Sequence, residues 1–65
     1  IAMAKAPTIS APQHPAMHVA YEKECREMLE PHLDFLLDKV EAQGWDRRLA
    51  ASALMYLSAV RLKPA

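Results

Sequence analysis

The sequence contains few cysteine, glycine or aromatic residues. It has one cysteine, Cys25, and one glycine, Gly44, and aromatic side chains make up 6% of its 65 residues. A single cysteine excludes a disulfide within the chain, and a single glycine argues against a turn-rich β fold. A domain this small buries only about 60% of the surface that its unfolded chain exposes, so its core is marginal. Association with another chain is the device that the composition favours for completing such a core.

The chain also lacks net charge, because its eight basic side chains balance its eight acidic ones. This balance removes the strong basic character expected of a dedicated nucleic-acid binder. The charges are nevertheless segregated along the sequence. Residues 17–43 contain seven acids and three bases, whereas residues 45–63 contain one acid and four bases. An acidic first half and a basic second half attract each other, either within one chain or between two copies.

No segment has the composition of a signal peptide or of a membrane span. Residues 1–16 contain a single lysine and no apolar run, and the most apolar stretch, residues 49–60, includes Ser52 and Ser58. A membrane helix needs about 20 predominantly apolar residues, and a signal peptide needs an apolar central region. We therefore expect a cytoplasmic protein without membrane contact, which agrees with the use of one cysteine.

What is present is helical periodicity, which divides the chain into two parts. Residues 1–16 contain three prolines and no apolar period, and we expect a disordered tail whose first residues need not be native. Residues 17–63 form the expected helical domain. A first helix is predicted to begin near Pro15 because proline suits the first helical position, and apolar side chains then recur at three- and four-residue steps from Met17 to Val40.

Pro31 interrupts this first helix and leaves two alternatives open. Proline removes a backbone donor and disfavours a helical conformation at the residue before it. The helix either continues with a kink or stops and restarts, which would give three short helices in total. The phase of the apolar stripe is kept through Pro31, and this favours a kinked but continuous helix.

A short corner is predicted to join the first helix to a second one. Gly44 has the position of a left-handed C-cap, and Asp46 is a good N-cap for a helix over residues 47–62. Because the connection is so short, the two helices are expected to be antiparallel neighbours or to cross steeply, with Trp45 closing the open end of their core. The fold class is therefore all-α, a helical hairpin.

The second helix is apolar nearly all round, and a helix of this kind is normally buried. One antiparallel neighbour cannot cover it, and the Met17–Met28 part of the first helix would also lack a partner within the chain. We therefore expect dimerisation into a four-helix bundle. The predicted interface residues are Leu33, Leu36, Val40, Trp45, Leu49, Ala53, Leu54, Tyr56, Leu57 and Val60.

Few residues suggest chemistry. His14, His18 and Glu22 are spaced at steps of four and would share a helical face, which is a known metal-ligand spacing, but a fraying helix end favours three solvated residues. Cys25 has mainly acidic neighbours, which favours a structural thiol over a reactive one. The sequence therefore predicts no catalytic residue, no metal site and no cofactor.

The segment 40–53 also has the outline of a helix-turn-helix, with Arg47 and Arg48 where a recognition helix first meets DNA. Against this, alanine and leucine occupy the positions that should read bases, and the preceding helix is acidic. The preferred prediction is a non-enzymatic protein–protein interaction module, structural, adaptor or regulatory, acting through self-association or a partner helix. A DNA-binding regulator that uses Arg47 and Arg48 is the alternative.

Overall fold

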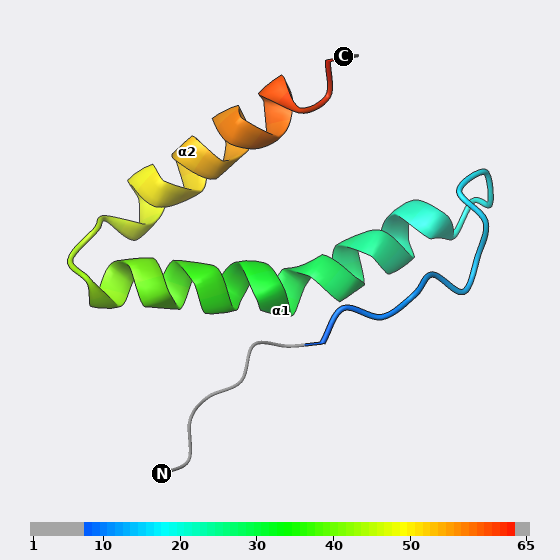
Figure 1. The fold of residues 1–65 in the computed structure, drawn as a ribbon, viewed down its shortest axis with the longest axis horizontal. Helices are drawn as coiled ribbons and strands as arrows, with labels where there is room; N and C mark the ends of the chain where they lie inside the picture. Colours follow the sequence, from blue (N-terminus) through cyan, green and yellow to red (C-terminus); the bar gives the residue numbers. More distant parts are fainter. Residues whose placement is uncertain (1–7, 64–65) are drawn as a thin grey trace, which may run out of the picture. The chain divides into compact units, whose positions relative to one another are not determined.

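The computed structural model describes residues 8–63, and in this range the chain forms two helices and no strand (Figure 1). Helix α1 spans Tyr21–Ala42 and helix α2 spans Arg47–Val60. The all-α helical hairpin predicted from the sequence is thereby confirmed. Neither described helix combines the length and the apolar content that crossing a bilayer requires. The chain divides into two compact units, Ile1–Phe35 and Leu36–Ala65, each of which is described by itself below.

Helix α1 begins at Tyr21, six residues later than the sequence predicted. Residues 15–20 form turns instead, in which the His18 N–H donates to the Pro15 carbonyl at 2.8 Å and the His18 Nδ1 accepts from the Ala20 N–H at 3.0 Å. Met17 is almost fully exposed, so no apolar contact offsets the cost of starting a helix there. The His18 ring thus satisfies a backbone donor ahead of the helix.

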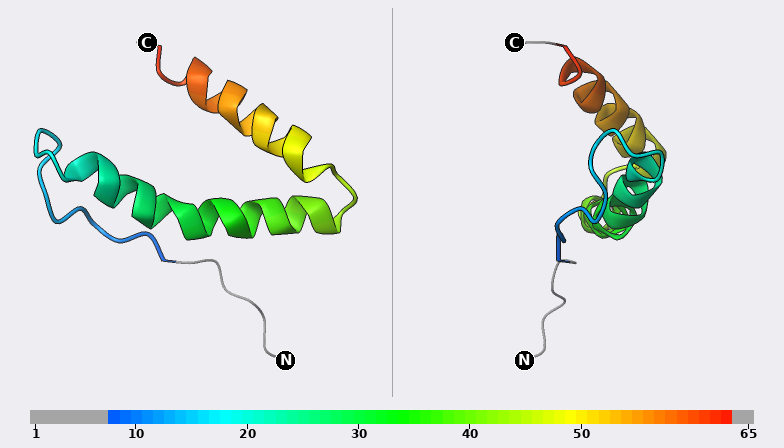
Figure 2. Two further views of the ribbon diagram at one scale, coloured as in Figure 1. Left: turned by 180° about the vertical axis from the view of Figure 1, so that it is seen from behind. Right: turned by 90° about the vertical axis from the view of Figure 1, so that its right-hand side faces the viewer.

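Helix α1 continues through Pro31 and is drawn as one uninterrupted coil in the left view of Figure 2. The proline ring removes one of the intrahelical hydrogen bonds, but the turns on both sides keep theirs. Two pairs of side chains four residues apart support the N-terminal half, with Arg26 Nε 2.8 Å from Glu22 Oε2 and Lys23 Nζ 3.9 Å from Glu27 Oε2. The interpretation of two helices broken at Pro31 is excluded for this part of the chain.

The corner between the helices is closed by two backbone hydrogen bonds. Gly44 has a φ of +103°, and its N–H donates to the Glu41 carbonyl at 2.9 Å, while the Trp45 N–H reaches the Val40 carbonyl at 3.3 Å. This pair of bonds is the Schellman motif, which satisfies carbonyls left free at a helix end and favours glycine at the left-handed position. The predicted glycine C-cap is confirmed.

Helix α2 starts at the residue that the sequence indicated. The Asp46 side chain accepts from the Leu49 N–H at 2.9 Å, so the N-cap prediction is confirmed. At the other end the helix stops at Val60, two residues before the predicted end. There the Arg61 and Leu62 N–H groups turn to carbonyls three residues back, and the Arg61 guanidinium donates to the Leu57 carbonyl at 2.8 Å. The last turn is thus tightened and capped by a basic side chain.

Substitution of Gly44 by alanine should destabilise the corner by about 1 kcal/mol or more, because a Cβ disfavours the positive φ. No atom lies within 4 Å of the position that this Cβ would occupy, so the loss is conformational and not a clash. Urea unfolding followed by circular dichroism would measure it. Gly44→Asn should cost less than Gly44→Ala, since asparagine tolerates the left-handed region better. Equal losses for the two variants would contradict the conformational explanation.

Substitution of Asp46 by alanine should cost about 1 kcal/mol, because the Leu49 N–H loses its acceptor at the N-terminus of α2. Asp46→Asn is the matched control, since the amide oxygen still accepts this hydrogen bond and should keep most of the stability. Helicity and the urea midpoint would be compared for the three proteins. If Asp46→Ala is as stable as the original protein, the cap contributes nothing to the free energy of unfolding.

Candidate interaction surface

The second unit holds an apolar hollow between the last turns of α1 and the facing side of α2. Its volume is about 260 Å³. Leu36, Leu37 and Val40 line it from α1, Trp45 from the corner, and Ala50, Ala53, Leu54 and Leu57 from α2. Every one of these side chains is apolar, so the hollow suits another apolar side chain and offers almost nothing to a polar ligand.

The hollow is incompletely closed by the unit itself. Leu37 is 7% exposed and is the one apolar side chain that counts as buried in residues 8–63. Trp45 keeps 69% of its surface exposed although it lines the hollow, and Leu57 keeps 45%. Trp45 therefore stands at the corner as predicted, but it does not seal the end of a core. A tryptophan seals a core only where a second apolar wall covers its outer face, and the other corner residues, Gln43, Gly44 and Asp46, supply none.

One basic side chain ties the two helices of this unit together beside the hollow. Arg47 Nη1 lies 2.8 Å from Asp38 Oδ1 and 2.9 Å from Glu41 Oε1, one turn apart on α1. The hydrogen bonds to Asp38 and then to Glu41 raise the pKa of Arg47, so the guanidinium stays charged. The attraction that the sequence predicted between the acidic first half and the basic second half thus acts here inside one chain.

The ten predicted interface residues fall into two groups. The hollow brings together Leu36, Val40, Trp45, Ala53, Leu54 and Leu57, along with Leu37 and Ala50, which the prediction did not include. Leu49, Tyr56, Val60 and Leu33 lie outside it, and all four are exposed. Leu37 and Ala50 were already part of the apolar periodicity, and a helical wheel that placed the two helices face to face would have selected them.

The arginines of the DNA-binding alternative have different environments. Arg47 is held by two carboxylates, whereas Arg48 has no ion pair among the described residues. A guanidinium that already binds two acids offers less of its charge to a phosphate. The DNA-binding alternative stays a prediction.

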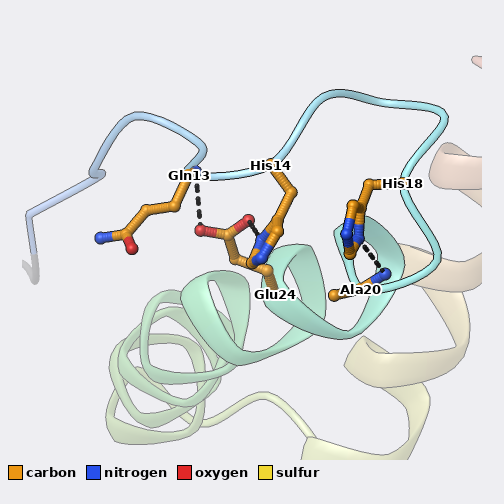
Figure 3. Close-up of polar contacts among 5 residues, drawn as sticks. All are labelled: Gln13, His14, His18, Ala20 and Glu24. Atoms are coloured by element: carbon orange, nitrogen blue, oxygen red, sulfur yellow. Dashed lines mark hydrogen bonds and ion pairs between the residues drawn. The ribbon is translucent and has the colours of Figure 1, made fainter.

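In the first unit, the segment before α1 contacts the helix through one carboxylate (Figure 3). The Gln13 N–H donates to Glu24 Oε2 at 2.8 Å, and His14 Nδ1 lies 3.1 Å from Glu24 Oε1. The His14 and His18 rings lie with their centroids 4.5 Å apart. The hydrogen bond from His14, followed by that from the Gln13 amide, lowers the pKa of Glu24.

This contact gives the start of α1 a neighbour within the chain, which the sequence analysis did not foresee. Ser10, Ala11 and Pro12 line a small hollow of about 70 Å³ together with Tyr21, Glu24, Cys25 and Met28 of α1. The expectation that the Met17–Met28 stripe lacks an intramolecular partner is therefore wrong for Tyr21, Cys25 and Met28. Cys25 is partly buried there as a free thiol.

The three residues considered as metal ligands do not share a helical face. Because α1 begins at Tyr21, His14 and His18 lie in turns, where His14 contacts Glu24 and His18 accepts from Ala20. Glu22 is paired with Arg26. Within residues 8–63, no three histidine, cysteine or acidic side chains gather as metal ligands would.

Comparison of the chain with protein-family models, with curated proteins and with solved structures finds no match.

The contact at Glu24 should be visible in its titration. Because the folded chain favours the carboxylate, the stabilisation is complete above the unfolded pKa of Glu24 and is lost as the pH falls through the lowered folded value. An NMR titration should therefore give Glu24 a lower pKa in the native chain than in urea. The Gln13 amide shift should follow the same midpoint and lose that transition in Glu24→Gln. A native midpoint equal to the unfolded one would contradict the contact.

Proposed function

We propose that this chain is a small protein–protein interaction module that acts by self-association. The observation that carries the proposal is the contrast between one buried apolar side chain, Leu37, and a second helix whose large apolar side chains are nearly all exposed. A folded monomer normally scatters its exposed apolar residues singly. A continuous exposed set is typical of an interface.

The exposed set is dense in the second helix and in the residues just before and after it. It comprises Trp45, Leu49, Met55, Tyr56, Leu57, Val60 and Leu62. Burial of apolar surface is worth roughly 25 cal/mol per Å², so covering several such side chains contributes several kcal/mol to association. In a chain whose own core is this small, that contribution also stabilises the helices themselves, because binding to the folded state alone raises its population.

A second copy is the occupant that the charges favour. The chain has no net charge, and therefore two copies do not repel each other as a whole. Its acids concentrate in residues 17–43 and its bases in residues 45–63, so that each copy offers a region of each sign to the other. The Arg47 pairs with Asp38 and Glu41 are an instance of this attraction within one chain.

Analytical ultracentrifugation over a range of concentrations tests the proposal. One chain has a mass of 7.3 kDa, and we expect a species of about twice this mass that dissociates on dilution. Leu57→Asp should remove it, because a carboxylate placed in the apolar hollow has no partner when the surface is covered. Ser58→Asp, at the neighbouring exposed position, makes the same charge change outside the hollow and should leave the dimer intact.

The mass of the unaltered protein decides the outcome. A single-chain mass at every concentration, including the highest reached, would overturn self-association whatever the variants do. If Leu57→Asp also loses its helical circular dichroism, the loss of mass follows from unfolding, and the unaltered protein alone then carries the test.

A further inference from the structure

We infer that α2 meets the second copy through a stripe formed by Leu49, Ala53, Tyr56 and Val60, and that this stripe packs on helix α1 of that copy. The inference rests on the proposed function and adds to it the contact face and the partner helix. The four residues, called here the α2 stripe, follow one another at steps of four, three and four. This is the spacing of the contact positions in two helices that pack along their length.

The α2 stripe is distinct from the side of α2 that faces its own α1. Ala50, Leu54 and Leu57 line the hollow, whereas Leu49, Tyr56 and Val60 do not. At about 100° per residue, the centres of these two sides lie about a quarter of a turn apart, with Ala53 between them. Leu49 is 71% exposed and Tyr56 is 68% exposed. The hairpin thus uses one side of α2 internally and leaves the second without a partner in its own unit.

Small side chains beside the α2 stripe allow another helix to approach it closely. Ala50, Ser52 and Ala59 border it along the helix, and all three side chains are small. Small flanking residues allow the backbones of two helices to approach closely, so that a helix fits this face better than a loop. No charged side chain lies in the α2 stripe or at these three flanking positions.

Helix α1 carries a matching feature. Leu29 and Leu33 lie four residues apart on it, and each remains more than two-fifths exposed. Two acids on the same helix, Glu30 and Asp34, have no ion pair among the described residues. Helix α1 therefore offers exposed apolar side chains and, on the same helix, unpaired negative charge.

The charges on the other helix are complementary. Arg48 at the start of α2 and Lys63 just after its end have no ion pair within residues 8–63. Arg47 already shows that a base of this region pairs with acids of α1, at distances below 3 Å. Docking α2 of one copy onto α1 of the other brings unpaired bases to unpaired acids, whereas docking α2 onto α2 would bring base to base. This charge complementarity favours helix α1 of the second copy as the partner of the α2 stripe.

The first test separates contact from folding. Leu49 is the third residue of α2, where glutamate stabilises a helix behind an Asp46 cap. Leu49→Glu should therefore keep or raise the helicity and yet weaken the dimer at least about tenfold, because the carboxylate loses water inside the interface. Tyr56→Asp should weaken it as strongly. Met55→Asp is the matched control: Met55 is 74% exposed and adjacent in sequence but lies off the α2 stripe, so the dimer should persist.

The second test identifies the partner helix by exchanging charges in the full chain. Glu30→Lys with Asp34→Lys in one protein, and Arg48→Glu with Lys63→Glu in another, should each weaken the homodimer. An equimolar mixture should form the mixed dimer more tightly than either protein dimerises alone, because the reversed charges again attract. Sedimentation with one protein carrying a fluorescent label would measure the mixed species.

The outcomes separate this inference from the proposed function. If the unaltered chain dimerises but Leu49→Glu and Tyr56→Asp dimerise equally well, self-association stands and the α2 stripe is not its contact face. If those two variants fail but the charge-exchanged mixture shows no preference for the mixed dimer, the assignment of α1 as partner is overturned. If the unaltered chain remains a single-chain species, both proposals fail together.

Discussion

The second unit of this protein depends on the corner that Gly44 and Asp46 create. Two backbone hydrogen bonds end α1, and the positive φ of Gly44 reverses the chain. The Asp46 carboxylate then accepts from the Leu49 N–H and caps the first turn of α2. Only because the turn is this short do Leu36, Leu37 and Val40 face Ala50, Leu54 and Leu57 across one hollow. Because the turn is short, Arg47 also lies within reach of Asp38 and Glu41. Ion pairs and apolar contacts therefore stabilise the same end of the two helices.

The hairpin is also limited by this arrangement. The apolar side chains of α2 point in several directions, and one neighbouring helix contacts one direction only. The remaining apolar surface of α2 either stays in water or is covered by further protein, and the marginal core of a hairpin this small favours covering it.

Local signals in the sequence were sufficient for the features that depend on a few neighbouring residues. The glycine C-cap and the aspartate N-cap were predicted from their positions, and the phase of the apolar stripe favoured the continuity of α1 through Pro31. Each of these is decided by contacts within one or two turns of backbone. The prediction of α2 erred by two residues at its end, where a 3₁₀-like turn and the Arg61 side chain close the helix.

Features that depend on distant residues were missed. The start of α1 was placed near Pro15 because proline suits a first turn, but nothing buries Met17 or Val19, and the chain forms turns until Tyr21. The contact of Gln13 and His14 with Glu24 joins residues ten or more apart, for which the sequence holds no periodic signal. Likewise, periodicity identified the apolar residues of α2 without showing which of them would line the hollow, since that depends on the turn angle at the corner.

The position of Trp45 makes the intrinsic fluorescence of the protein sensitive to what covers the hollow. It is the one tryptophan of the chain, it lines the hollow, and most of its indole surface meets water. Any molecule that covers the hollow must also displace water from this ring, and an indole in an apolar setting emits at shorter wavelength than one in water. The intrinsic fluorescence of the protein, excited where tyrosine hardly absorbs, therefore reports on the occupancy of a single place in the structure without any label.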